Sequence, residues 1–183
     1  MYATDIDTLF IEIPRTGMRS LEFALRGVYR VSHVGHYTVQ RFLDCVKAPP
    51  TNYVAVIRDP LDRLLSAVNF SCNTKEQVDQ AFSKLLINGY STEIIAPSSS
   101  DELEYVYAPQ TAYLNADVNY RLYRFDDMMG FYNSCGIGKS PPHKNISKKW
   151  FSLEALQSHH LFSEIMQVYK KDVDLYKTLK LTP

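Results

Sequence analysis

The chain has 183 residues, of which 45% are apolar and 22% charged, with 20 basic and 20 acidic side chains. This composition fits a single globular domain over residues 1–183 and excludes wholesale disorder. A net charge of zero argues against a nucleic-acid binder, which usually carries a basic surplus. The charge is uneven, because residues 73–119 hold 2 basic and 7 acidic side chains and residues 120–183 hold 10 and 6.

The first half predicts strands that alternate with helices. An apolar strand is expected over residues 8–13 and a helix over 18–28. A second strand (29–34) and helix (38–46) follow, and then the clearest strand, 53–57. A helix over 61–70 comes next, with Asp59 as its N-cap and Pro60 at its first position. This alternation predicts a parallel α/β sheet.

The second half is less regular. A helix is predicted over residues 74–88, and the polar stretch 89–110 is expected to be a surface excursion. A fourth strand (120–125) leads into a short helix, and 136–149 is expected to be a loop. A single helical pattern runs from 152 to 179.

Three scattered cysteines suggest buried free thiols, with no disulfide framework and no metal site. No apolar run approaches the roughly 18 residues of a membrane helix, and the acidic N-terminus does not look like a signal peptide. We therefore expect a soluble, intracellular chain without nucleic-acid or membrane partners.

The turn after the first strand has features that bind anions. Backbone N–H groups of residues 16–19 would lie at a helix N-terminus, where they attract phosphate. The side chains of Arg15, Thr16 and Ser20 add donors, and Gly17 allows a positive φ or a close approach. The glycine, lysine and serine or threonine pattern of nucleotide-triphosphate loops is absent, which disfavours a kinase. An ordinary strand-to-helix turn fits this segment equally well.

The second strand-to-helix unit adds donors at the same edge of the predicted sheet. Arg58 ends one strand and Ser66 lies about two turns into the following helix, so both would face the usual ligand edge. Two such strand ends suggest a ligand with two separated phosphates. Alternatively, Arg58 could simply pair with Asp59 or Asp62.

Two segments resemble the cofactor-binding motifs of sulfotransferases. Residues 10–21 (FIEIPRTGMRSL) look like the family's 5′-phosphosulfate motif, and 56–67 (VIRDPLDRLLSA) look like its 3′-phosphate motif. Further similarities follow in family order at residues 35–36, 108–111, 122–127, 143–147 and 169–176. The resemblance covers nearly the whole chain and is closest to the carbohydrate branch.

This resemblance implies a three-layer, P-loop-like fold with a central parallel sheet between helices. It implies 3′-phosphoadenosine 5′-phosphosulfate (PAPS) as the donor and adenosine 3′,5′-bisphosphate as the product. Because the chain is compact for this family and shows no membrane anchor like that of its Golgi members, we expect a cytoplasmic protein of a bacterium or virus. Arg15 would stabilise the leaving phosphate. Many members have lysine there, and small residues where Met18 and Arg19 stand. The expected cofactor-binding residues are Arg15, Thr16, Gly17, Met18, Arg19, Ser20, Arg58, Ser66, Ser147, Lys148 and Lys149.

The acceptor hydroxyl needs a base, and His36 after the second strand is the first choice. His33 is a rival, and so is Glu12, which could instead form a salt bridge with Arg15 or another arginine. Gln110 would orient the acceptor or cofactor. The expected acceptor is a carbohydrate hydroxyl that is neutral or cationic, given the acidic middle of the chain. Sulfation of a protein tyrosine or small alcohol is an alternative, as is a non-catalytic nucleotide-binding protein.

Overall fold

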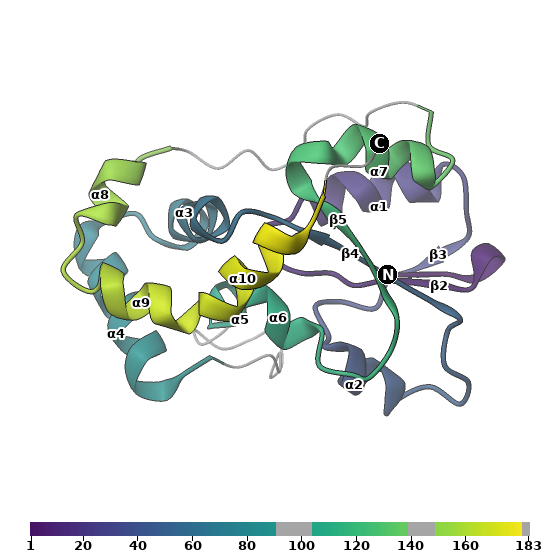
Figure 1. The fold of residues 1–183 in the computed structure, drawn as a ribbon, viewed down its shortest axis with the longest axis horizontal. Coiled ribbons are helices and arrows are strands. Elements are labelled where there is room, and N and C mark those ends of the chain that lie inside the picture. The colour runs from purple at the N-terminus through teal and green to yellow at the C-terminus, as the bar shows by residue number, and fades with distance from the viewer. Residues whose placement is uncertain (91–103, 139–148, 181–183) are drawn as a thin grey trace.

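The computed structural model describes residues 1–90, 104–138 and 149–180, which form a mixed α/β fold with one five-stranded sheet (Figure 1). The strand order is β3-β1-β2-β4-β5. The strands are β1 (Tyr2–Ala3), β2 (Thr8–Phe10), β3 (Val31–Ser32), β4 (Asn52–Ile57) and β5 (Tyr120–Arg124).

The sheet is mixed, so the prediction of a wholly parallel sheet is wrong. β2, β4 and β5 pair in parallel, whereas β1 is antiparallel to both β2 and β3. Only the 3-10 turn Thr4–Ile6 and Asp7 separate β1 from β2, and so short a connection allows only antiparallel pairing. Since β1 opposes both neighbours, β3 still runs in the same direction as β2. The four predicted strands therefore end at one edge.

Helices cover both faces of the sheet. On one face, α1 (Met18–Arg26) and α7 (Met128–Ser134) pack against Phe10, Val54 and Val56. On the other, α2 (Val39–Leu43), α6 (Gln110–Tyr113) and α10 (Lys170–Thr178) pack against Leu9 and Ala55. β4 is buried on both faces, which explains its continuous apolar run.

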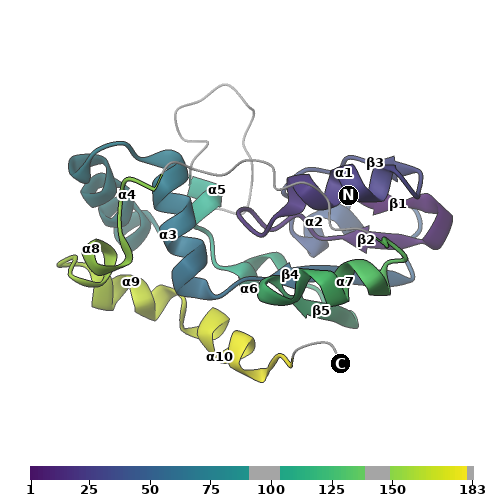
Figure 2. The same ribbon diagram turned by 90° about the horizontal axis from the view of Figure 1, so that it is seen from above.

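A second group of helices lies at one end of the sheet (Figures 1 and 2). It comprises α3 (Pro60–Ser71), α4 (Lys75–Asn88), α5 (Glu104–Tyr107), α8 (Leu153–Gln157) and α9 (Phe162–Val168). These helices share a core that includes Leu64, Phe82, Leu156 and Tyr169. The predicted cap of α3 is confirmed, because the Asp59 carboxylate accepts hydrogen bonds from the N–H groups of Leu61 and Asp62.

Two expectations for the second half need correction. The single C-terminal helix is three helices, and the breaks between them let Leu156, Ile165 and Tyr169 all reach the core. The expected surface excursion lies partly outside the described residues, but its end, 106–110, is buried. Side chains from distant helices hold this end in the core, because Arg63 donates to the carbonyls of Val106 and Ala108, and the Tyr169 hydroxyl donates to that of Tyr107.

Among the described residues, no helix is both long and apolar enough to cross a membrane.

Candidate functional site

A cleft of about 1080 Å³ opens where β2 and β4 end and α1 and α3 begin. Its lining comes from six separate parts of the chain. These are the loop after β2 with the start of α1, the turn after β3, the end of β4 with α3, and three later segments at 105–106, 125–132 and 149–153. The lining residues used below are Glu12, Arg15, Gly17, Met18, Arg19, Ser20, Glu22, His33, His36, Arg58, Asp62, Ser66, Phe70, Tyr105, Phe125 and Lys149.

Arg15 occupies a conformation that non-glycine residues rarely adopt, with φ at 67°. Its Nε donates a hydrogen bond of 3.1 Å to the Ser66 hydroxyl, and its guanidinium lies 4.5 Å from the centre of the Phe70 ring. Backbone strain of this kind persists only where surrounding contacts fix it. The two predicted donors Arg15 and Ser66, 51 residues apart, therefore lie together in the cleft.

Arg58 completes this group. Its Nη1 donates to the Arg15 carbonyl at 2.9 Å, and its guanidinium covers the Phe125 ring at 4.7 Å. Its Nε also forms an ion pair of 2.6 Å with Asp62, so the alternative pairing expected from the sequence is present as well. Burial, followed by repulsion from Arg58 and Arg63, lowers the pKa of Arg15. Such crowding of cations favours an anionic ligand.

Gly17 is required at the start of α1 for two reasons. Its φ is +77°, and an added Cβ would lie 2.9 Å from the Phe125 ring, closer than real contacts allow. The N–H groups of Ser20 and Leu21 donate to the Gly17 carbonyl, which marks the first turn of the helix. The amides just before that turn lie at a helix N-terminus, as expected for an anion site.

The neighbouring loop residues divide into two groups. The Thr16 side chain is fully buried, and its hydroxyl donates to the Ile13 carbonyl at 2.8 Å. It holds the loop closed and is absent from the cleft lining, so only its backbone fits the predicted role. Met18, Arg19 and Ser20 do line the cleft, with Arg19 exposed and the other two buried.

His36 lies in the cleft beside the loop that joins β2 to α1 (residues 11–17), which is called the arginine loop below. Its Nδ1 is 2.5 Å from the backbone carbonyl of Glu12, and its ring stacks on Tyr105 at 5.3 Å. Because a carbonyl only accepts, Nδ1 must carry the proton and Nε2 must carry the free electron pair. Burial lowers the pKa of His36, which keeps the ring neutral at pH 7. A neutral imidazole with a fixed tautomer is suited to accept a proton.

The two rival bases have other partners. The Glu12 carboxylate, 5% exposed, forms an ion pair of 2.7 Å with the Met1 ammonium group and accepts a hydrogen bond from the Gly35 N–H. The alternative expectation of an arginine partner for Glu12 is therefore wrong. His33 is exposed and lies 3.5 Å from Glu12.

Gln110 is fully buried and does not line the cleft. Its side-chain amide binds both the N–H and the carbonyl of Arg58, each at 2.9 Å, so it positions the end of β4. This contradicts a direct role in binding the acceptor or cofactor. Lys149 is exposed at the cleft, whereas Ser147 and Lys148 lie outside the described residues.

Sequence reasoning missed the most buried charge near the cleft. Arg63 is fully buried, and its guanidinium donates to the carbonyls of Pro14, Val106 and Ala108. It therefore ties the arginine loop to the segment before α6. A signal was present, because position 63 shares one face of the helix with the apolar positions 60, 64 and 67. No comparable sequence pattern marks Phe70 and Phe125, whose rings lie against the guanidinium groups of Arg15 and Arg58.

Comparisons with protein-family models, curated proteins and solved structures each found no match. The functional assignment therefore rests on the chemistry of the cleft.

Proposed function

We propose that this protein transfers a sulfuryl group from PAPS to an acceptor hydroxyl, most simply one on a carbohydrate. The observation that carries the proposal is the convergence of Arg15, Arg58 and Ser66 from two strand–loop–helix units, with the neutral His36 in the same cleft. Their order along the chain matches the sulfotransferase motifs that the sequence resembles. We also propose that the mixed α/β fold of this chain is of the sulfotransferase type.

The cleft residues fit a nucleotide with phosphates at two positions. Arg15 and the first turn of α1 would hold the 5′-phosphosulfate, where backbone N–H groups and a guanidinium suit an oxyanion. Arg58 and Ser66 would hold the 3′-phosphate. To do so, Arg58 would exchange its exposed ion pair with Asp62 for the ligand, since such pairs are weak in water. When bound, PAPS supplies an activated sulfuryl group.

On the acceptor side, His36 Nε2 would take the hydroxyl proton as the acceptor oxygen forms its bond to sulfur. The sulfur–oxygen bond to the nucleotide phosphate breaks, and Arg15 would stabilise the negative charge that develops on that phosphate. The Glu12 carbonyl holds the imidazole so that the proton arrives on Nε2. The resulting imidazolium is stabilised by the nearby Glu12 carboxylate, which favours the charged form of His36.

Two carboxylates that line the cleft beside His33 bear on the class of acceptor. Glu12 and Glu22 lie 3.5 Å and 4.0 Å from the His33 ring, and all three residues line the cleft. Each carboxylate already pairs with a cation, Glu12 with the Met1 ammonium group and Glu22 with Arg26, so the two offer hydrogen-bond acceptors more than net charge. Such acceptors suit sugar hydroxyls and ammonium groups better than a highly anionic acceptor. A neutral or cationic sugar hydroxyl is therefore proposed ahead of a sulfated polysaccharide.

The test is transfer of labelled sulfate from PAPS to a panel of neutral and amino sugars, phenols and tyrosine peptides. The proposal predicts label on a sugar hydroxyl and a loss of more than about 100-fold in rate with His36→Ala. Label on phenols or peptides alone would replace the carbohydrate acceptor. Nucleotide binding without transfer to any acceptor would contradict catalysis and support a non-catalytic nucleotide-binding protein.

A further inference from the structure

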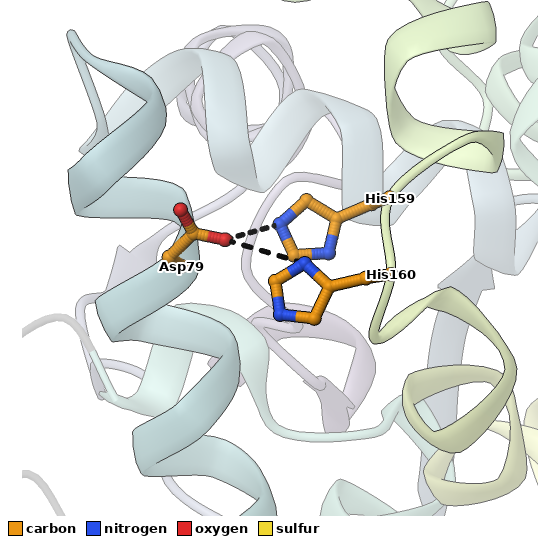
Figure 3. Close-up of side chains that lie close together, drawn as sticks. All are labelled: Asp79, His159 and His160. Atoms are coloured by element: carbon orange, nitrogen blue, oxygen red, sulfur yellow. Dashed lines mark ion pairs between the residues drawn. The ribbon is translucent and has the colours of Figure 1, made fainter.

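Two histidines and one aspartate, none of which lines the cleft, point at one another on the helical side of the molecule. Asp79 lies on α4, and His159 and His160 lie in the turn between α8 and α9 (Figure 3). One ligand atom from each residue falls within 4.8 Å of the other two. In the described parts of the chain, this is the one such group of three metal-ligating side chains.

We infer that Asp79, His159 and His160 form a binding site for a divalent transition-metal ion of the Zn²⁺ class. Zn²⁺ binds nitrogen and oxygen ligands at about 2.0–2.1 Å, so tetrahedral ligands lie about 3.3 Å apart. Asp79 Oδ1 is 2.9 Å from His159 Nε2 and 3.7 Å from His160 Nδ1, and these distances bracket that value. Small side-chain shifts would bring all three atoms to one ion.

The donor set selects the kind of ion. Two imidazoles and one carboxylate suit Zn²⁺, Cu²⁺ or Ni²⁺, whereas Mg²⁺ and Ca²⁺ prefer oxygen ligands alone. Three protein ligands leave a fourth position for water. The exposure of His160 (70%) and Asp79 (49%) leaves that position open to solvent.

The arrangement of the two imidazoles favours a metal ion bound by both rings over a simple ion pair with Asp79. Asp79 and His159 already make a direct contact, so His160 is not needed to satisfy either group. Nevertheless, the exposed His160 ring stacks on His159 at 4.7 Å and turns its Nδ1 to the same carboxylate oxygen. Both sides are rigidly mounted, because Asp79 lies between the buried Val78 and Phe82 of α4 and His159 packs edge-on against Phe82.

Binding requires a change of tautomer at His159. Its Nδ1 accepts a hydrogen bond from the Leu161 N–H at 3.2 Å, so the proton of the metal-free ring is on Nε2, facing Asp79. The ion replaces that proton, the ring takes up a proton at Nδ1, and the Leu161 N–H loses its acceptor. Nitrogen-15 NMR of the imidazoles reports this exchange directly.

The site would link α4 to the turn that follows α8. The segment 149–153, which lines the cleft, runs directly into α8. An ion held between α4 and His159 would therefore also brace that wall of the cleft. This role is structural and does not depend on the chemistry proposed for the cleft.

The test is titration of tag-free protein with ZnCl₂, followed by calorimetry and thermal unfolding. We expect one ion per chain, a rise in Tm of about 5–10 °C at 100 times the Kd, and no effect of Mg²⁺. Asp79→Asn and His160→Ala, both at exposed side chains, should each weaken binding more than about tenfold. Glu164→Gln, an exposed carboxylate on α9, is the matched control and should bind normally.

The NMR spectrum should show His159 bound through Nε2 with its proton on Nδ1. No Zn²⁺ binding at submillimolar metal would overturn the inference and leave an ion-pair contact between α4 and the turn. Binding that survives both Asp79→Asn and His160→Ala would overturn it equally.

Discussion

Gly17→Ala is expected to damage both stability and nucleotide binding. An alanine at φ +77° costs about 1–2 kcal/mol of backbone strain. Its Cβ, 2.9 Å from Phe125, would displace a ring that supports the Arg58 guanidinium, which costs a further 0.5–1 kcal/mol or so. The sum is about 1.5–3 kcal/mol, or a fall in Tm of roughly 3–12 °C. Affinity for adenosine 3′,5′-bisphosphate should fall about tenfold, because Arg58 moves.

Gly136→Ala is the matched control for Gly17→Ala. Gly136 also has a positive φ (+71°), but its Cβ would meet only the Tyr29 hydroxyl at an ordinary 3.4 Å, and it lies outside the cleft lining. We expect a loss of about 1–2 kcal/mol with unchanged nucleotide affinity. Equal loss of stability in the two variants, with nucleotide affinity intact in both, would refute the role assigned to Phe125 and Arg58. Thermal unfolding and calorimetry provide both quantities.

Three further variants and conditions separate the roles of individual side chains. His36 must be neutral to accept a proton and its pKa is lowered, so kcat/KM for transfer should hold down to pH 6.5 and decline only below it; a decline centred above 6.5 would count against His36 as the base. Arg63→Met leaves three buried carbonyls without their donor, and should cost about 3–5 kcal/mol in urea unfolding; a loss below about 1 kcal/mol would contradict this. Thr16→Val should cost about 1 kcal/mol of stability yet leave the nucleotide Kd unchanged, whereas a tenfold weaker Kd would mean that the hydroxyl binds the anion.

Local sequence patterns predicted the elements that carry the site. Asp59 and Pro60 marked the start of α3, and the apolar run 53–57 marked β4 within a residue. Because predicted strands of one direction end at one edge, the pairing of Arg15, Arg58 and Ser66 in a cleft followed from the sequence. The strand directions held even though β1, only two residues long, was missed and separates β2 from β3.

The errors arise where distant polar groups decide burial. The sequence predicts Gln110 as a ligand residue, yet contacts with the Arg58 backbone and with Asp172 on α10 hold it in the core. It predicts Thr16 as an anion donor, yet the Thr16 hydroxyl donates to the Ile13 carbonyl within the loop. Periodicity does not show which backbone group a buried polar side chain will meet, because that depends on how separate elements pack.

The central claim is that the cleft recognises a nucleotide with phosphates at both its 3′ and 5′ positions. The most direct test is calorimetric titration with adenosine 3′,5′-bisphosphate and with adenosine 5′-monophosphate. The account predicts that the bisphosphate binds more than about tenfold tighter, since Arg58 and Ser66 are proposed to hold the 3′-phosphate, which the monophosphate lacks. Arg58→Met should remove this preference, and Arg121→Met, at an exposed β5 position outside the cleft lining, should retain it. Equal affinity of the unaltered protein for the two nucleotides, or binding of neither, would contradict the account.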